Sequence, residues 1–286
     1  MSHQQPDPVR RRILQKSGIG ALAVTALAAG MGVQSSPAEA QGVNDAAVLN
    51  FALNLEYLEA EFYLRAATGV GLSAVDTSGN GYANSVTGGS KVPFTSGAVA
   101  QYAAEIAQDE LNHVRLLRSG LGSSLVGQPA IDLSQSFVTL GNLIGVPNFN
   151  PFLNDLNFLI GAYIFEDVGV TAYHGGSGLI SNKQILSIAA GILAVEAYHA
   201  AEVRLQLFQA GAGTATNNIS NVRKSLSGAN DDAGVLNANG TANIVLADSN
   251  GVAFTRSPRQ VLNIVYGAQN ASRGLFFPNG LNGAVK

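Results

Sequence analysis

The stretch VEAYHAAEV, residues 195–203, places Glu196, His199 and Glu202 at intervals of three within a mostly apolar segment. Side chains three positions apart on an α-helix project from neighbouring points of one face. A carboxylate and an imidazole with this spacing can therefore bind the same metal ion. A single pair of this kind is also common on solvated helix faces, so its meaning depends on whether the chain repeats it.

The chain repeats this spacing in DELNHVR, residues 109–115, where Glu110 and His113 are again three apart. The periodicity of apolar residues predicts four long helices, over residues 45–67, 96–119, 150–174 and 182–209. The two Glu-x-x-His pairs therefore lie on the second and the fourth predicted helices, and we look for further ligands on the first and the third.

The lengths of the connections predict how these helices are arranged. Residues 70–95 form a Gly-, Ser- and Asn-rich loop, and residues 121–149 form a longer central connection. Short links make antiparallel neighbours, whereas a long central link can cross the length of a bundle. We therefore predict a mainly α fold, an antiparallel four-helix bundle over residues 41–211 with a long central crossover.

Residues 212–286 are predicted to form a C-terminal extension, because the helical periodicity ends near its start. Asn239-Gly240 and Asn250-Gly251 are typical of hairpin turns. The segment SPRQVLNIVYG, residues 257–267, predicts a short helix with Pro258 at its first position. We expect this extension of hairpin and short helix to pack on the bundle or on a partner subunit.

Glutamates on the first and third predicted helices complete a candidate metal site. One Glu from each of two helices and one Glu-x-x-His from each of the other two form the dinuclear iron or manganese site of four-helix bundles. Burying four carboxylates together costs a prohibitive amount of free energy without counter-charge. Two divalent cations supply that charge. The predicted ligands are Glu56, Glu110, His113, Glu166, Glu196 and His199, with Glu59 as the alternative to Glu56.

The choice between Glu56 and Glu59 depends on how the first helix is aligned with the third. Pairing Glu56 with Glu166 also pairs Tyr63 with Tyr173, each seven residues further on and on the same helix face. Pairing the two LNF tripeptides instead matches Glu59 with Glu166. The two tyrosines either donate hydrogen bonds near the site or only pack beside it.

Two more polar side chains lie beside the motifs. Glu202, one turn beyond His199, is either an acceptor for the outer nitrogen of that histidine or, as we favour, a surface charge. His174 precedes Gly175-Gly176 and has the helix-end position of a capping residue, so we assign it no metal role.

The first 40 residues resemble an export signal. Arg10, Arg11 and Arg12 precede an apolar run over residues 18–33, and an Ala-x-Ala site ends at Ala40. A basic start, a short apolar run and such a site are typical of a cleaved secretory signal, and the paired arginines favour the twin-arginine type. We therefore expect a periplasmic or secreted protein, cleaved after Ala40, with no membrane span in the mature chain.

The charge and sulfur content narrow the function further. Without the four bases and two acids of residues 1–40, the 16 basic and 19 acidic side chains become 12 and 17, a formal net charge of −5. An acidic chain is a poor partner for nucleic acid. The chain has no cysteine, and its only methionines are Met1 and Met31, so the mature chain has no sulfur to oxidise.

The sequence resembles the ferritin-like superfamily, and more narrowly the exported branch that includes plant desiccation-related proteins. The resemblance covers nearly all of the mature chain and is carried by LNFALNLEYLEAEFY at 49–63, DELNHV at 109–114, EAYHAAEVR at 196–204, and RSPRQVLNIVYG and GLFFPNGLNG in the extension. It implies a four-helix bundle with a metal-capable centre and an association with stress. It also favours Glu56 over Glu59, because the Glu after Asn-Leu is the ferritin ligand. The long loops and added tail depart from storage ferritins.

Three functions are compatible with these residues. The favoured one is oxidation of ferrous iron by oxygen or peroxide, by an exported protein with a centre of two iron ions, in stress protection. The second is peroxide dismutation by two manganese ions, as in manganese catalases. The third is a non-enzymatic desiccation or envelope protein with a structural or vestigial metal site. The expected partners are metal ions and oxygen or peroxide, and a homo-oligomer is compatible with the sequence.

Overall fold

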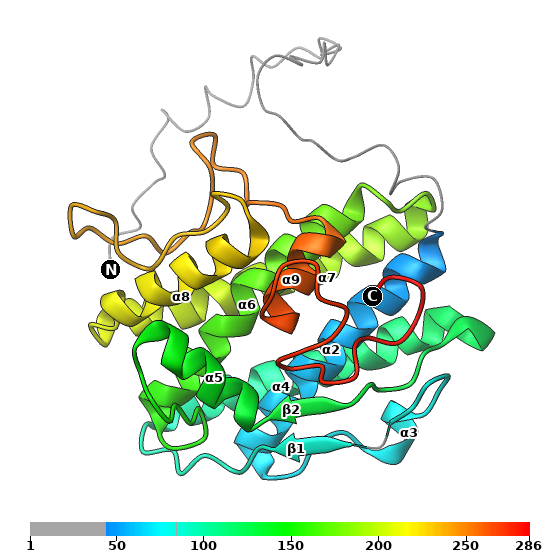
Figure 1. Cartoon of the computed structure of the whole chain (residues 1–286), viewed down its shortest axis with the longest axis horizontal. Coiled ribbons are helices and arrows are strands. Elements are labelled where there is room, and N and C mark those ends of the chain that lie inside the picture. Colours follow the sequence, from blue (N-terminus) through cyan, green and yellow to red (C-terminus); the bar gives the residue numbers. More distant parts are fainter. Residues whose placement is uncertain (1–43, 84) are drawn as a thin grey trace, which may run out of the picture. The chain divides into compact units, whose positions relative to one another are not determined.

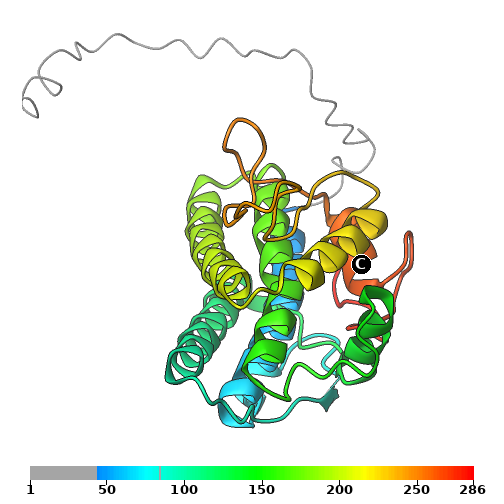
Figure 2. The ribbon, with the colours of Figure 1, turned by 90° about the vertical axis from the view of Figure 1, so that its left-hand side faces the viewer.

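The structure is a computed structural model and describes residues 44–83 and 85–286. The predicted export signal, residues 1–40, lies outside the described residues. The bundle consists of the long helices α2 (Asp45–Thr68), α4 (Gly97–Leu121), α6 (Asp155–Ser177) and α7 (Lys183–Gln209). Helix α2 packs along α4, α6 packs along α7, and α2 also contacts α6 (Figure 2). The predicted four-helix bundle is confirmed.

Each long helix begins at a polar side chain that accepts a hydrogen bond from a backbone N–H of its first turn, a favourable arrangement for these otherwise unpaired donors. The capping residues are Asn44, Ser96, Asn154 and Asn182. Helix α6 begins at Asp155, five residues later than predicted, because Asn154 caps it. Pro151, a residue type that is favourable in a first helical turn, lies in the turn before the helix.

The two connections expected as loops contain short elements, and one strand of each pairs with the other. These elements are α3 (Ala74–Thr77) and β1 (Val86–Gly88) in the first connection, and η1 (Gly122–Ser124), β2 (Ile131–Leu133) and α5 (Gln135–Ile144) in the second. Strands β1 and β2 run parallel, with Val86 opposite Ile131 (Figure 1). The connection from α4 to α6 is the predicted long crossover.

Helix α8 (Gly213–Ser227) corrects the expectation that helical structure ends near Ala212. Its sequence is rich in Gly, Thr, Asn and Ser, which have low helix propensity. Its apolar residues nevertheless recur with helical spacing and pack against the core; they are Ala215, Ile219, Val222 and Leu226. Contacts with α5, α6, α7 and α9 therefore stabilise a helix that local propensity does not predict.

Helix α9 (Pro258–Tyr266) begins as predicted. Ser257 accepts from the backbone of Gln260, and the Gln260 side chain accepts in return from the backbone of Ser257. The two predicted hairpin turns are each flanked by a single antiparallel bridge, Leu236 with Ala242 and Ala247 with Ala253. The extension is thus a helix, two small hairpins, a second helix and a tail.

The C-terminal tail contacts the helices of the bundle. The Phe276 ring lies 4.9 Å from that of Phe165 in α6. Asn282 and Asn54 of α2 are joined by two hydrogen bonds: the Asn282 N–H donates to Asn54 Oδ1 at 3.0 Å, and Asn54 Nδ2 donates to the Asn282 carbonyl at 2.9 Å. These two hydrogen bonds therefore hold the tail against α2, the helix that carries Glu56.

Helix α7 is, among the described residues, long and apolar enough to cross a membrane by length and composition. Core helices pass the same test. Three charged or polar side chains of α7, Glu196, His199 and Arg204, are buried inside the bundle and face partners there. We therefore describe α7 as a bundle helix.

Candidate metal centre

All six predicted ligands meet inside the bundle. Each of the four long helices contributes at least one of them, and no ligand residue is more than 6 % exposed. They form two groups of potential donors, in each of which the ligand atoms lie within 4.8 Å of one another. The first group consists of Glu56, Glu110, His113 and Glu196, and the second consists of Glu110, Glu166 and His199.

Glu110 belongs to both groups. Its Oε2 lies 3.4 Å from His113 Nδ1, and its Oε1 lies 3.2 Å from His199 Nδ1. Burial opposes its ionisation, but the neighbouring imidazoles of His113 and His199 outweigh burial and lower the pKa of Glu110 to about 2. The carboxylate of Glu110 is therefore placed to bridge two metal positions.

The remaining donors surround these two positions. Glu56 Oε2 lies 3.3 Å and Glu196 Oε1 lies 3.6 Å from His113 Nδ1. On the other side, Glu166 Oε2 lies 3.7 Å from His199 Nδ1. The two imidazole rings, 6.4 Å apart between their centroids, thus present their Nδ1 atoms to two neighbouring sets of carboxylate oxygens.

Two tyrosines hold the outer oxygens of two ligands. The Tyr63 hydroxyl donates to Glu166 Oε1, and the Tyr173 hydroxyl donates to Glu56 Oε1. Each tyrosine thus leaves the second oxygen of its glutamate free to face the centre. Of the two roles predicted for these tyrosines, hydrogen bonding near the site is the one that the structure shows.

Asp109 orients His199. Its Oδ2 lies 3.2 Å from His199 Nε2, so the proton belongs on Nε2 and Nδ1 is left as the metal-binding nitrogen. Sequence reasoning considered Glu202 for this role and missed Asp109. Glu202 has no hydrogen bond to His199 in the described part of the chain. His174, given no metal role, contacts the Phe254 carbonyl through Nδ1 at 3.1 Å.

The buried oxygens that face the centre have no hydrogen-bond partner within the described residues. These atoms are Glu56 Oε2, Glu110 Oε1, Glu166 Oε2 and both carboxylate oxygens of Glu196, together with His199 Nδ1. Unpaired buried polar atoms are costly, and bound cations would satisfy them all. The donor set, carboxylates with two imidazoles, suits a pair of iron or manganese ions.

Without cations, the site holds protons instead. Burial raises the pKa of Glu56 to about 7 and that of Glu166 to about 8, and it raises the pKa of Glu196 well above its usual range. Burial would lower the pKa of His113, but the carboxylates of Glu56 and Glu110 outweigh it and raise that pKa to about 11. Because metal ions bind carboxylates and neutral imidazoles, metal binding releases these protons.

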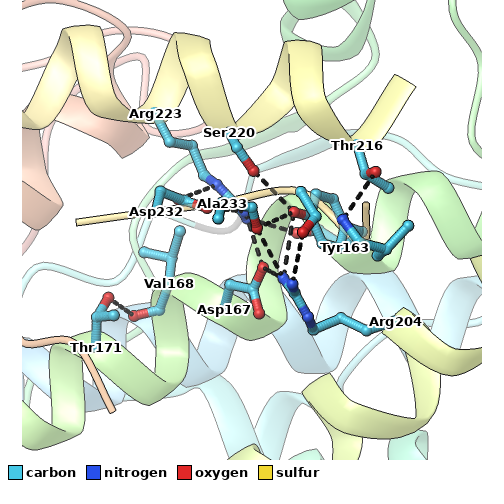
Figure 3. Close-up of polar contacts among 12 residues, drawn as sticks. Tyr163, Asp167, Val168, Thr171, Arg204, Thr216, Ser220, Arg223, Asp232 and Ala233 are labelled. Atoms are coloured by element: carbon cyan, nitrogen blue, oxygen red, sulfur yellow. Dashed lines mark hydrogen bonds and ion pairs between the residues drawn. The ribbon is translucent and has the colours of Figure 1, made fainter. Parts of the chain in front are cut away.

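A buried network of arginines and aspartates includes Asp167, the residue that follows Glu166 in the sequence (Figure 3). Asp167 accepts from Arg204 Nη1 at 2.8 Å and from Arg223 Nη2 at 2.9 Å. Arg204 also donates to the carbonyls of residues 233, 234, 243 and 244 in the extension. Asp232 pairs with both Arg223 and Arg256. The network joins the extension to α6 and α7 next to the ligands, and sequence reasoning did not find it.

The fold and this arrangement of ligands define a class of protein. The model of the ferritin-like domain family matches residues 44–209, so the chain belongs to the ferritin-like family.

Two curated relatives are similar over most of their length. The desiccation-related protein PCC13-62 of Craterostigma plantagineum is 31% identical over 271 residues, which cover 84% of this chain and 83% of that protein. The ferritin-like catalase Nec2 of Nesocodon mauritianus is 28% identical over 278 residues, which cover 86% of this chain and 87% of that protein. No solved structure matches the chain.

Proposed function

We propose that this protein is an exported dinuclear metal protein that dismutates hydrogen peroxide. The observation that carries the proposal is the set of buried, unpartnered carboxylate and imidazole atoms from four helices, arranged as two groups that share Glu110. A relative named as a ferritin-like catalase, aligned over most of both chains, supports peroxide as the substrate.

The burial of the centre limits the size of its substrate. The six ligands are at most 6 % exposed, so dioxygen, peroxide or a metal ion can reach them more readily than an organic substrate. The absence of cysteine, and of methionine after Met31, suits a chain that works in peroxide, because sulfur side chains are readily oxidised.

A pair of redox metal ions, when bound, supplies two-electron chemistry that converts two molecules of hydrogen peroxide into two of water and one of dioxygen. The protein's residues hold and orient that pair. Glu110 would contact both ions, His113 and His199 would bind through Nδ1, and Asp109 would keep the His199 proton on the outer nitrogen. The protons that leave the carboxylates on metal binding make room for cation charge.

Oxygen release tests the proposal. Metal-free protein loaded with manganese or with iron is given peroxide, without added ferrous iron, in an oxygen electrode. We expect one dioxygen for every two peroxides, and no release from the Glu110→Ala variant loaded in the same way. Peroxide loss without dioxygen, or equal release by the variant, contradicts dismutation.

Ferrous iron oxidation is the second candidate, and Asp109 favours it. Its side chain is 38% exposed while it contacts His199, so a negative group lies between solvent and the centre, where it can attract cations. Oxidation of two ferrous ions by one peroxide consumes two protons and releases two water molecules. Ferric absorbance that rises with added ferrous iron, without dioxygen release, identifies this activity.

Export and metal identity need their own measurements. We propose a periplasmic or secreted protein that is cleaved after Ala40, which N-terminal sequencing of the protein from its native compartment tests. Elemental analysis of the same sample decides between iron and manganese. A sample without metal, with stress tolerance unchanged in Glu110→Ala plus Glu196→Ala, would support the non-enzymatic alternative.

A further inference from the structure

Glu59 is a buried carboxylate without a partner. It lies on α2 one turn beyond Glu56 and is 5% exposed. Within residues 44–83 and 85–286 it has no hydrogen bond and no ion pair. Glu61, two residues later and 2% exposed, accepts from Arg65 Nε at 2.7 Å, from the Leu72 N–H and from Gln128 Nε2. A structural buried glutamate in this helix is thus satisfied, whereas Glu59 is not.

Gly169 of α6 shows where Glu59 points. A Cβ atom at Gly169 would lie 2.3 Å from Glu196 Oε2 and 3.3 Å from Glu59 Oε1. A real Cβ atom essentially never makes the first of these contacts and seldom makes one as tight as the second, so both carboxylates extend toward space that glycine leaves free at position 169. Glu59 therefore approaches the same point as Glu196, whose oxygens are unpartnered.

Glu59 and Gly169 make the two halves of the centre unequal. Glu56 and Glu166 occupy equivalent positions, because the tyrosine seven residues after each one donates to the other. Three residues after them come Glu59 on α2 and Gly169 on α6. The two halves of the centre thus differ by one carboxylate, which extends toward the helix face where its counterpart has no side chain.

We infer that Glu59 is a fifth carboxylate of the metal centre and that its charge favours trivalent over divalent ions. The inference rests on the proposed metal centre. Two divalent ions balance four carboxylates, and a fifth leaves an excess negative charge. The attraction of Glu59 to a cation grows with the charge of that cation. Glu59 therefore stabilises two trivalent metal ions more than two divalent ones. The two electrons that separate these states pass to peroxide, which takes up two protons and forms two water molecules.

Ions that undergo no redox reaction test how cation charge affects binding to the centre. The full chain, freed of metal, is titrated with Zn²⁺ by competition with a chelator and with Tb³⁺ by luminescence excited through its tyrosines. Glu59→Gln keeps the size and one oxygen donor but removes the charge. We expect about tenfold weaker binding of Zn²⁺ and about 30-fold weaker binding of Tb³⁺, since each unit of cation charge loses its attraction to the same carboxylate.

Two variants serve as controls. Glu202→Gln also removes one negative charge, one turn from His199, and is expected to leave both affinities within about twofold. Glu59→Asp keeps the charge and is expected to keep the wild-type ratio of Tb³⁺ to Zn²⁺ affinity. An unchanged ratio in Glu59→Gln overturns the inference, and so does a wild-type chain that binds neither ion.

The outcomes also separate this inference from the proposed activity. A selective loss of Tb³⁺ binding in Glu59→Gln, with no dioxygen from manganese- or iron-loaded wild-type protein, retains the fifth carboxylate and rejects dismutation. Dioxygen release by the wild type, with an unchanged affinity ratio in Glu59→Gln, retains dismutation and rejects the role of Glu59.

Discussion

Glu56 of α2 and Glu166 of α6 are each held by a tyrosine from the other's helix. Tyr173 of α6 donates to Glu56, and Tyr63 of α2 donates to Glu166. The two helices therefore depend on each other for the orientation of their ligands. Each tyrosine satisfies one oxygen, and the second oxygen of each glutamate, which has no partner, faces the centre.

Removing either tyrosine hydroxyl should weaken the metal-free fold equally. Tyr63→Phe and Tyr173→Phe each leave one buried carboxylate oxygen unpaired, which costs about 1–3 kcal/mol. Denaturant unfolding of the metal-free variants measures this loss. Tyr198→Phe, at a side chain that is 74% exposed, is the control and should change nothing. Unequal losses in the two variants would contradict the reciprocal arrangement.

The number of bound metal ions should depend on Glu110, which belongs to both groups of donors. Because this carboxylate faces both histidines, Glu110→Ala should lose both ions, whereas Glu166→Ala should lose only the ion near His199. Elemental analysis after equilibrium loading measures the ions per chain. Glu202→Ala is the control and should keep the wild-type content. Retention of one ion by Glu110→Ala would show that Glu110 does not bridge.

The stability of the metal-free protein should fall as pH rises. The raised pKa values, about 7 for Glu56, about 8 for Glu166 and about 9 for His199, mean that the folded state binds more protons than the unfolded state. Their contribution is fully present below the unfolded values, near 4.5 for Glu and 6.5 for His, and is lost as pH rises through the folded values.

Thermal unfolding between pH 5 and pH 9, about the range of these titrations, measures this effect with and without metal. We expect the melting temperature of the metal-free protein to fall across the range. Bound cations replace the protons, so the metal-loaded protein should not show the same fall. A metal-free melting temperature that rises with pH would contradict the assigned burial of these carboxylates.

Arg204→Met should destabilise the whole protein. The change leaves Asp167 with one arginine partner and removes the donor from four backbone carbonyls. Breaking a buried pair in this way costs about 3–5 kcal/mol. Arg115→Met is the matched control: its side chain is 52% exposed beside Asp76, so the loss should stay below about 1 kcal/mol. Similar losses in both variants would refute the anchoring role of Arg204.

The helices that carry the ligands could be predicted because local signals agree along them. Repeated three-residue spacing, apolar periodicity and polar caps such as Asn44 and Asn182 all indicate the same segments. The start of α6 was wrong by five residues because a proline at 151 is favourable in a first turn but does not require one. The side chain of Asn154 determines the start instead.

The remaining features depend on contacts between distant segments. Asp109 reaches a histidine 90 residues away, and Arg204 binds carbonyls of a segment without regular structure, so neither has a local signal. Spacing could not choose between Glu56 and Glu59 because both lie on one face of α2. The structure brings both toward the centre. In α8, the apolar spacing of Ile219 and Leu226 indicates a helix although the helix propensity of its residues is low.

The pairing of Asn54 with Asn282 has a consequence for biosynthesis. A ribosome has completed every candidate ligand by His199, yet Asn54 gains its partner only when Asn282, four residues before Lys286, has been made. A polypeptide truncated before Asn282 would therefore carry all the candidate ligands and lack this closure. Such fragments should be the first that proteases degrade.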